Sequence, residues 1–138
     1  MRLHRHKLLA GLTIGALLAI GIAGVAGARM SHWRHLRRVT VTVVNGSLPP
    51  PYGKPHTRRF RTRQQLVRVT RALNANHIAG RAARASDDCT GGYDVRLTIV
   101  PAHGARTRLT AYRCGDTTFG QIAGNVPRFL TAIGLAAS

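Results

Sequence analysis

Few residues of this chain could take part in acid–base, nucleophilic or metal chemistry. Its 138 residues include 4 acidic side chains, all of them Asp, and 2 Cys. Asp87-Asp88-Cys89 joins two carboxylates to a thiol, but no His lies near it in sequence, and thiol chemistry needs a base within reach. His32-x-x-His35 has metal-ligand spacing, but the surrounding arginines would repel a cation. Because glycine-rich phosphate loops and nucleophile elbows are also missing from the sequence, we expect a non-enzymatic protein without metal or cofactor.

Positive charge dominates the composition. The chain has 21 Lys and Arg residues, which gives a formal net charge of +17, and the densest run is Arg58-Arg59-Phe60-Arg61-Thr62-Arg63. Guanidinium groups bind phosphates and carboxylates through paired hydrogen bonds, so this run predicts an anion-binding surface. The predicted residues are Arg58, Arg59, Arg61 and Arg63. On an edge strand, the same charges would only prevent pairing with another sheet.

The distribution of arginine indicates what kind of partner to expect. Arginines occur along the whole chain, and the run has only Phe60 beside it. Specific nucleic-acid recognition needs a stacking platform or a confined basic stripe, so we do not expect it here. Sequence-independent binding to anionic lipid head groups or to wall polymers needs charge alone, and added salt would weaken it.

The N-terminal residues predict a membrane segment. A basic tail, residues 1–7, precedes 21 uncharged residues, Leu8–Ala28. At about 1.5 Å per residue, such a helix covers a hydrocarbon core of roughly 30 Å. We therefore predict a transmembrane helix or uncleaved signal anchor over residues 8–28. Because Ala26-Gly27-Ala28 also fits a signal-peptidase site, secretion after cleavage near Ala28 is the alternative.

The segment after the apolar run, residues 29–38, is a basic juxtamembrane linker in this interpretation. An aromatic side chain and arginines at this position are typical of a membrane interface. The predicted interface residues are Arg29, Trp33, Arg34, Arg37 and Arg38. Within the apolar run, small residues recur at every fourth position, which would give a helix-packing face for a homodimer, although an Ala- and Gly-rich run also produces this spacing by composition. These residues are Gly11, Gly15, Ala19, Ala23 and Gly27.

The orientation of the segment follows from two opposing observations. Basic residues flank both of its ends, and the slightly larger number after it favours a cytoplasmic C-terminal domain. Cys89 and Cys114 belong to no metal-binding cluster, so they predict a single disulfide, and disulfides persist outside the reducing cytosol. Two unconnected buried thiols are the alternative. We expect a single-pass protein of the cell membrane with its C-terminal domain outside.

Residues 39–138 predict one small domain. Val and Thr alternate over residues 39–44, which is typical of a half-buried strand, and the proline-rich residues 48–55 cannot continue it. A short strand over residues 57–62 precedes a capping box, Thr62 and Gln65, which predicts a helix beginning at Arg63 with its apolar face towards the core. This face comprises Leu66, Val69 and Leu73.

The second half of the domain predicts a hairpin followed by a helix. Residues 81–92 indicate a polar connection. Alternation over residues 93–99 and 109–112 predicts a hairpin centred near His103, in which facing residues sum to about 206. A further strand is expected near residues 117–122, and a helix over 125–136 buries Val126, Phe129, Leu130 and Ile133. We predict an α+β fold with a small antiparallel sheet and two helices packed on one face.

These features together resemble a group of bacterial proteins. The apolar N-terminal segment and the Val/Thr strand are followed by Ala72-Leu73-Asn74-Ala75, by Cys89 before a Tyr-x-Val-x-Leu strand, and by Cys114-Gly115 after a hairpin. This order resembles small exported proteins of unassigned function in high-GC actinobacteria, over residues 39 to about 115. The resemblance implies an exported, disulfide-linked domain without a known activity, and it assigns no functional residue beyond the two cysteines.

The sequence features described above are compatible with three functions. The first is an extracytoplasmic, membrane-anchored domain whose basic surface binds anionic lipid or wall polymer. The second is a membrane-tethered nucleic-acid binder with a cytoplasmic domain. The third is a secreted inhibitor or interaction module that uses the loop of residues 49–55. Secreted protease inhibitors of the same bacterial group are similar in size but normally have two disulfides, and this chain has 2 Cys.

Overall fold

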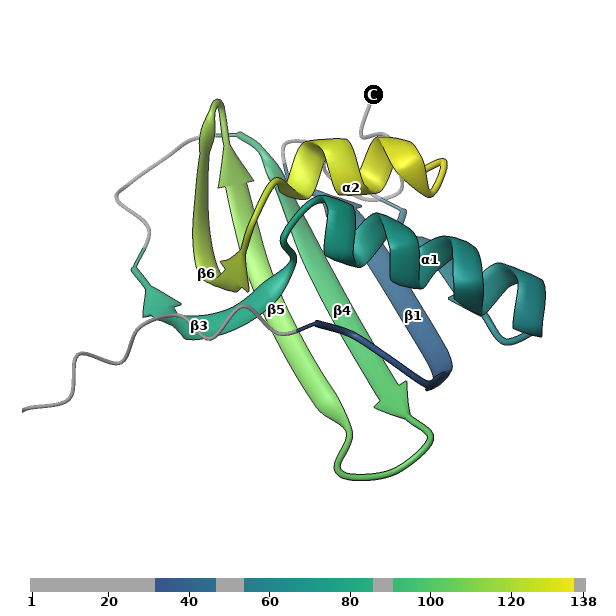
Figure 1. Cartoon of the computed structure of the whole chain (residues 1–138). Coiled ribbons are helices and arrows are strands. Elements are labelled where there is room, and N and C mark those ends of the chain that lie inside the picture. The colour runs from purple at the N-terminus through teal and green to yellow at the C-terminus, as the bar shows by residue number, and fades with distance from the viewer. Residues whose placement is uncertain (1–31, 47–53, 86–90, 136–138) are drawn as a thin grey trace, which may run out of the picture.

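A computed structural model describes residues 32–46, 54–85 and 91–135 of the chain. These residues form β1 (Leu36–Asn45), β2 (His56–Phe60), α1 (Arg63–Ala75), β3 (Ala79–Arg84), β4 (Tyr93–Pro101), β5 (Thr107–Cys114), β6 (Thr117–Ala123) and α2 (Val126–Ala132). The strands form one antiparallel sheet in the order β2-β1-β4-β5-β6-β3. Both helices lie on the same face of this sheet (Figure 1). The predicted α+β fold is confirmed, with six strands in its sheet.

The core lies between the sheet and the two helices. Val39, Val41 and Val43 of β1 are buried, as the alternation predicted, and they share one hydrophobic core with the predicted apolar faces of both helices. Val69 and Leu73 of α1 are buried and Leu66 is half-buried. Three of the residues predicted for the last helix are buried in α2, and the fourth, Ile133, is buried at its C-cap. The hydrophobic effect of this burial is the main contribution that holds the helices on the sheet.

Local signals set the helix ends and the hairpin register. The Thr62 hydroxyl accepts a hydrogen bond from the Gln65 backbone N–H at 3.3 Å, and the Gln65 side chain accepts one from the Thr62 N–H at 3.2 Å, which confirms the capping box. Asn125 caps α2 by accepting from the Arg128 N–H at 3.1 Å. Tyr93 faces Arg113 and Ile99 faces Thr107, so the predicted register of the β4–β5 hairpin is also confirmed.

One strand departs from the prediction. Residues 79–84, of which 81–84 were predicted to be a polar connection, form β3 and pair with β6 at the edge of the sheet. Only Ala79 of β3 is buried, so its sequence carries no alternation that could have revealed it. The Arg81 side chain extends along β6 and donates to the carbonyl oxygens of Gly120 at 3.1 Å and Thr118 at 2.7 Å. Pairing with β6, rather than a hydrophobic pattern, makes this segment a strand.

β1 also begins earlier than predicted, at Leu36 instead of Val39. Its pairing with β4 is irregular between Leu36 and Arg38, which identifies Arg37 as an inserted residue of a β-bulge. Without the bulge, strict alternation would place Leu36 on the face opposite to Val39. The extra residue returns Leu36 to the helix side, where it packs against the core. Residues 36–38, predicted to be linker, therefore belong to the sheet.

Several predictions fall outside the described residues. They concern the basic tail, the apolar segment Leu8–Ala28 with its small-residue face, Arg29, most of the proline-rich loop, and Asp87-Asp88-Cys89. Within residues 32–46, 54–85 and 91–135, neither helix has the length and hydrophobicity that a membrane crossing requires.

Candidate anion-binding site

The predicted arginine run does not form one surface. Its residues lie on β2 and at the start of α1, and successive side chains of a strand point to opposite faces. Arg58 faces Val41 on the helix side of the sheet, whereas Arg59 faces Thr40 on the other side. The alternation therefore assigns adjacent arginines to different environments.

Arg58 contacts the domain itself. Its Nη1 donates to the carbonyl oxygen of Ile133 and, at 3.4 Å, to that of Gly134, at the end of α2. These carbonyls have no partner within the helix, and a cation also interacts favourably with the negative end of the helix dipole. The guanidinium lies 5.7 Å from the centroid of the Phe60 ring. A Cβ at Gly134 would approach Nη1 to 2.5 Å, so the glycine provides the space that this contact needs.

The open face of the sheet, defined as the face opposite to α1 and α2, carries hydroxyl groups and guanidinium groups. Residues that face each other across strands share a face. One row crosses four strands as Arg59, Thr40, Thr98 and Arg108. The next row crosses the same strands as Thr57, Thr42, Arg96 and Thr110. Because neighbouring strands lie about 4.8 Å apart, the Cα atoms of Arg59 and Arg108 are about 14 Å apart, and Arg96 lies between them.

Three arginines of this face are exposed to solvent. Arg59, Arg96 and Arg108 form no hydrogen bond or ion pair within the described residues. The described acidic residues are Asp94, which lies on this face opposite Tyr112, and Asp116, which pairs with Arg113 at 3.4 Å. The three guanidinium groups are therefore available to external anions.

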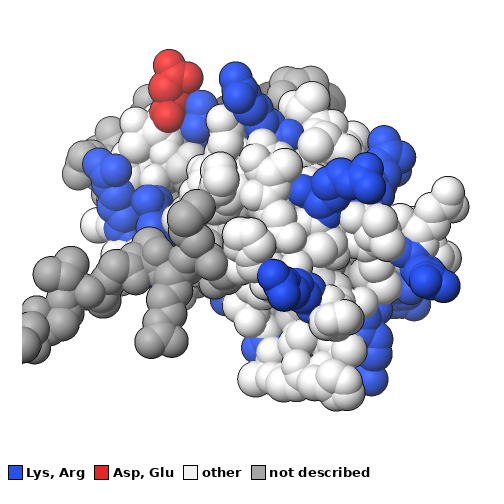
Figure 2. All heavy atoms as spheres, viewed as in Figure 1, with Lys and Arg blue, Asp and Glu red and all other residues white. Residues whose placement is uncertain are grey.

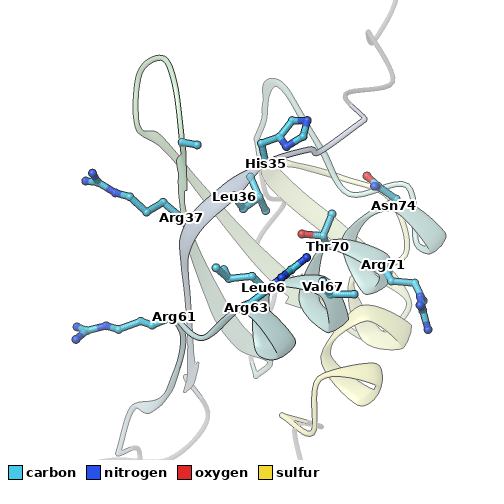
Figure 3. A pocket seen from close by; sticks show the side chains of 11 residues that line it. His35, Leu36, Arg37, Arg61, Arg63, Leu66, Val67, Thr70, Arg71 and Asn74 are labelled. Carbon is cyan, nitrogen blue, oxygen red and sulfur yellow. The ribbon is translucent and has the colours of Figure 1, made fainter.

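A second group of arginines borders a groove on the helix side of the molecule. The groove lies between the start of β1 and α1 (Figure 3), has a volume of about 730 Å³, and its lining is mostly apolar. Leu36 and Leu66 are half-buried there, and Val67 is 54% exposed. Four arginines border this apolar surface, namely Arg37, Arg61, Arg63 and Arg71.

The arginines of the groove lie in two places. Figure 3 shows Arg37 and Arg61 extending in the same direction, away from α1, whereas Arg63 and Arg71 lie along the helix. Arg38 joins Arg37 and Arg61 around a small hollow of about 200 Å³ beside the groove. None of these side chains meets a carboxylate within the described part of the chain. On the face shown in Figure 2, basic groups are spread widely and acidic atoms appear only at one edge.

Trp33, predicted to lie at a membrane interface, packs against the domain. Its backbone N–H donates to Asn74 Oδ1 at 2.9 Å, and Asn74 Nδ2 donates back to the Trp33 carbonyl at 3.0 Å. The indole N–H donates to the Ile78 carbonyl at 2.6 Å, and the ring contacts the core. The chain is thus fixed to the C-terminal end of α1 before β1 begins. A membrane-interface role of Arg34, Arg37 and Arg38 stays a prediction.

Among the remaining candidates, His35 lies beside the second arginine group, whereas Cys114 lies at the end of β5. Cys114, at the end of β5, is disulfide-bonded, and Cys89, the only other cysteine of the sequence, lies outside the described residues. Burial raises the pKa of Tyr93 above its usual value of 10.0, and the charge of Arg113 partly opposes this. His35 borders the groove, and the described residues contain no group of three potential metal ligands.

Comparisons with protein-family models, with curated proteins and with solved structures found no match.

Sequence reasoning missed two features of these surfaces. The groove depends on Leu36, whose place follows from the bulge at Arg37 and has no signal in the sequence. The open face could have been found, because the apolar Phe60 marks the core side of β2 and places Arg59 on the other side.

Proposed function

We propose that this chain is a non-enzymatic, single-pass membrane-anchored protein. Its domain lies outside the cytoplasm, and the open face of its sheet binds an anionic polymer of the cell wall. The observation that carries this proposal is the set of exposed guanidinium groups on that face that have no partner among the described residues, namely Arg59, Arg96 and Arg108.

The geometry of the open face suits an extended polyanion. The strand spacing places the Cα atoms of these arginines about 8 to 14 Å apart. This separation is wider than one phosphate or carboxylate group, and it matches several repeats of a polymer. Threonine hydroxyls between them can donate further hydrogen bonds to anionic oxygens. The aromatic residues of this face, Tyr112 and Phe119, lie towards its β6 side, and Arg84 covers the Phe119 ring at 5.7 Å. A row of stacked bases would therefore find little support.

Two observations support the location. The disulfide of Cys114 favours an oxidising compartment. Four residues separate Ala28 from Trp33, where the chain is fixed to the domain. An extended chain spans at most about 3.5 Å per residue, so an anchor over residues 8–28 would hold Trp33 within about 17 Å of the membrane.

The test is binding of a soluble polyanion, polyphosphate, to the full chain in nanodiscs of neutral phosphatidylcholine. The first variant replaces Arg59, Arg96 and Arg108 with Gln. A control variant replaces Arg34, Arg68 and Arg128, which are equally charged and exposed but lie elsewhere. Each lost phosphate contact reduces the slope of log affinity against log salt by roughly 0.7 to 0.9, so the open-face variant should lose a slope of about 2 to 3.

Two outcomes decide the matter. A large loss in the open-face variant with a small loss in the control supports the proposal. Equal losses in the two variants would show that only total charge matters, and the open face would then have no special role.

The location has a separate test, a reporter enzyme fused after Ser138. A reporter that is active only outside the cytosol should work in this fusion. Activity of a cytosolic reporter instead would favour the membrane-tethered alternative with a cytoplasmic domain.

A further inference from the structure

We propose that the groove between β1 and α1 binds one anionic phospholipid of the surrounding membrane. The phosphate group lies against Arg37 and Arg61, and an acyl chain lies over Leu36, Leu66 and Val67. This inference rests on the proposed function for the membrane anchor, but it does not depend on polymer binding at the open face.

The groove exposes an apolar surface. Among the described residues, Val67 is the large hydrophobic residue that is exposed to solvent, with an exposed fraction of 54%. It continues the half-buried surface of Leu36 and Leu66 in a hollow of about 730 Å³. Ligand pockets typically have volumes of about 300 to 1,000 Å³ and are mostly apolar with a few polar groups. A purely ionic ligand would leave this surface in water.

Positive charge gathers at one end of the groove. Arg37 and Arg61 extend away from α1, so they present guanidinium groups beyond the apolar surface (Figure 3). Arg38 adds a third charge beside them. No carboxylate compensates these charges within the described residues, and guanidinium groups bind phosphate oxygens in pairs. An apolar stretch that ends at several unpaired arginines complements an amphiphile with an anionic head.

The groove also lies close in sequence to the predicted anchor. His35 and Leu36 form part of its wall, and they follow directly on Trp33, where the chain from the apolar segment joins the domain. An anchor that ends at Ala28 would therefore hold the groove close to the head groups. An acidic amphipathic peptide has similar chemistry, but the short tether gives the membrane lipid a far higher local concentration.

The identity of the occupant can be read directly with a photoreactive side chain. The full chain carries benzoylphenylalanine in place of Val67 and is placed in nanodiscs of phosphatidylcholine, with or without phosphatidylglycerol. After irradiation, the mass of each adduct identifies what lay on the groove. A control chain carries the same group in place of Arg68, which is exposed on α1 but does not line the groove.

The expected result is an adduct with the mass of phosphatidylglycerol at position 67 and much less at position 68. Arg61→Gln should reduce its yield by about tenfold, since it removes a charged hydrogen bond to the phosphate. The matched variant Arg68→Gln should leave the yield unchanged.

Other outcomes overturn the inference. Equal adducts with phosphatidylcholine and phosphatidylglycerol would show apolar contact without recognition of the anionic head. Adducts with a second copy of the chain would assign the groove to self-association. Neither result would affect polymer binding at the open face, so the two proposals fail separately.

Discussion

Arg58 and Arg59 are adjacent and chemically identical, yet they should respond in opposite ways to the same substitution. Arg58 donates to the Ile133 and Gly134 carbonyls at the end of α2, while Arg59 has no partner within the described residues. We predict that Arg58→Gln destabilises the domain and leaves polyphosphate binding nearly intact, and that Arg59→Gln does the reverse.

The expected loss of stability follows from the contacts of Arg58. A hydrogen bond from a charged donor contributes about 1.5 to 3 kcal/mol when well shielded, and a cation at a helix C-terminus about 0.3 to 1 kcal/mol. Because Arg58 is partly exposed to solvent, which screens its charge, we expect about 1 to 2 kcal/mol in total. For a domain of this size, that corresponds to a fall in Tm of roughly 4 to 15 °C.

The assay is thermal unfolding of the full chain and both variants, followed by circular dichroism, together with polyphosphate affinity at low salt. Arg59→Gln should change the free energy of unfolding by less than about 0.5 kcal/mol, as exposed substitutions usually do. If the two variants lose stability equally, or if Arg58→Gln weakens binding as much as Arg59→Gln, the assignment of the two side chains to opposite faces is refuted.

Three further predictions concern the fold. Gly124→Ala should lower the free energy of unfolding, measured with denaturant, by about 2 to 4 kcal/mol. The reason is that φ at this residue is +101° and a Cβ would lie 2.5 Å from the carbonyl oxygens of Asn76 and His77. An unchanged midpoint of unfolding would contradict this. Reduction of the predicted Cys89–Cys114 bridge, which closes a loop of about 25 residues, should lower the free energy of unfolding by about 3 to 4 kcal/mol, and thiol titration before reduction should find no free cysteine. The raised pKa of Tyr93 favours its neutral form in the folded state, so stability should fall as pH rises above 10.0 towards the folded pKa, and Tyr93→Phe should flatten this fall in alkaline unfolding curves.

The parts of the fold that were predicted correctly depend on local patterns. The Val and Thr alternation of β1, the register of the β4–β5 hairpin and the caps of α1 and α2 are properties of neighbouring residues. Tertiary packing reinforces these patterns, so sequence and structure agree there. The apolar face of α2 was likewise correct at all four buried positions.

The parts that were missed depend on contacts between distant segments. β3 is a strand because β6 offers an unpaired edge, and its own residues show no alternation. The position of Leu36 in the groove depends on a bulge at Arg37 that only the pairing with β4 reveals. Trp33 precedes the first strand in a basic segment, and its hydrogen bonds to Asn74 and Ile78 span more than forty residues of the chain.

The arginine run illustrates a different difficulty. Charge density along the sequence predicted one binding surface, but β2 directs Arg58 and Arg59 to opposite faces, and Arg61 and Arg63 border the groove. The arginines that complete the open face, Arg96 and Arg108, come from strands far along the chain. Only the strand order brings them beside Arg59.

Binding of an anionic polymer by the open face can be observed directly by NMR of the arginine side-chain Nε–Hε groups of the full chain while polyphosphate is added. We expect the signals of Arg59, Arg96 and Arg108 to shift together and saturate. The signals of Arg58 and Arg81, which already donate to backbone carbonyls, should stay in place. Equal shifts at the exposed arginines Arg34, Arg68 and Arg128 would contradict it, because binding would then follow total charge and not the arrangement of the open face.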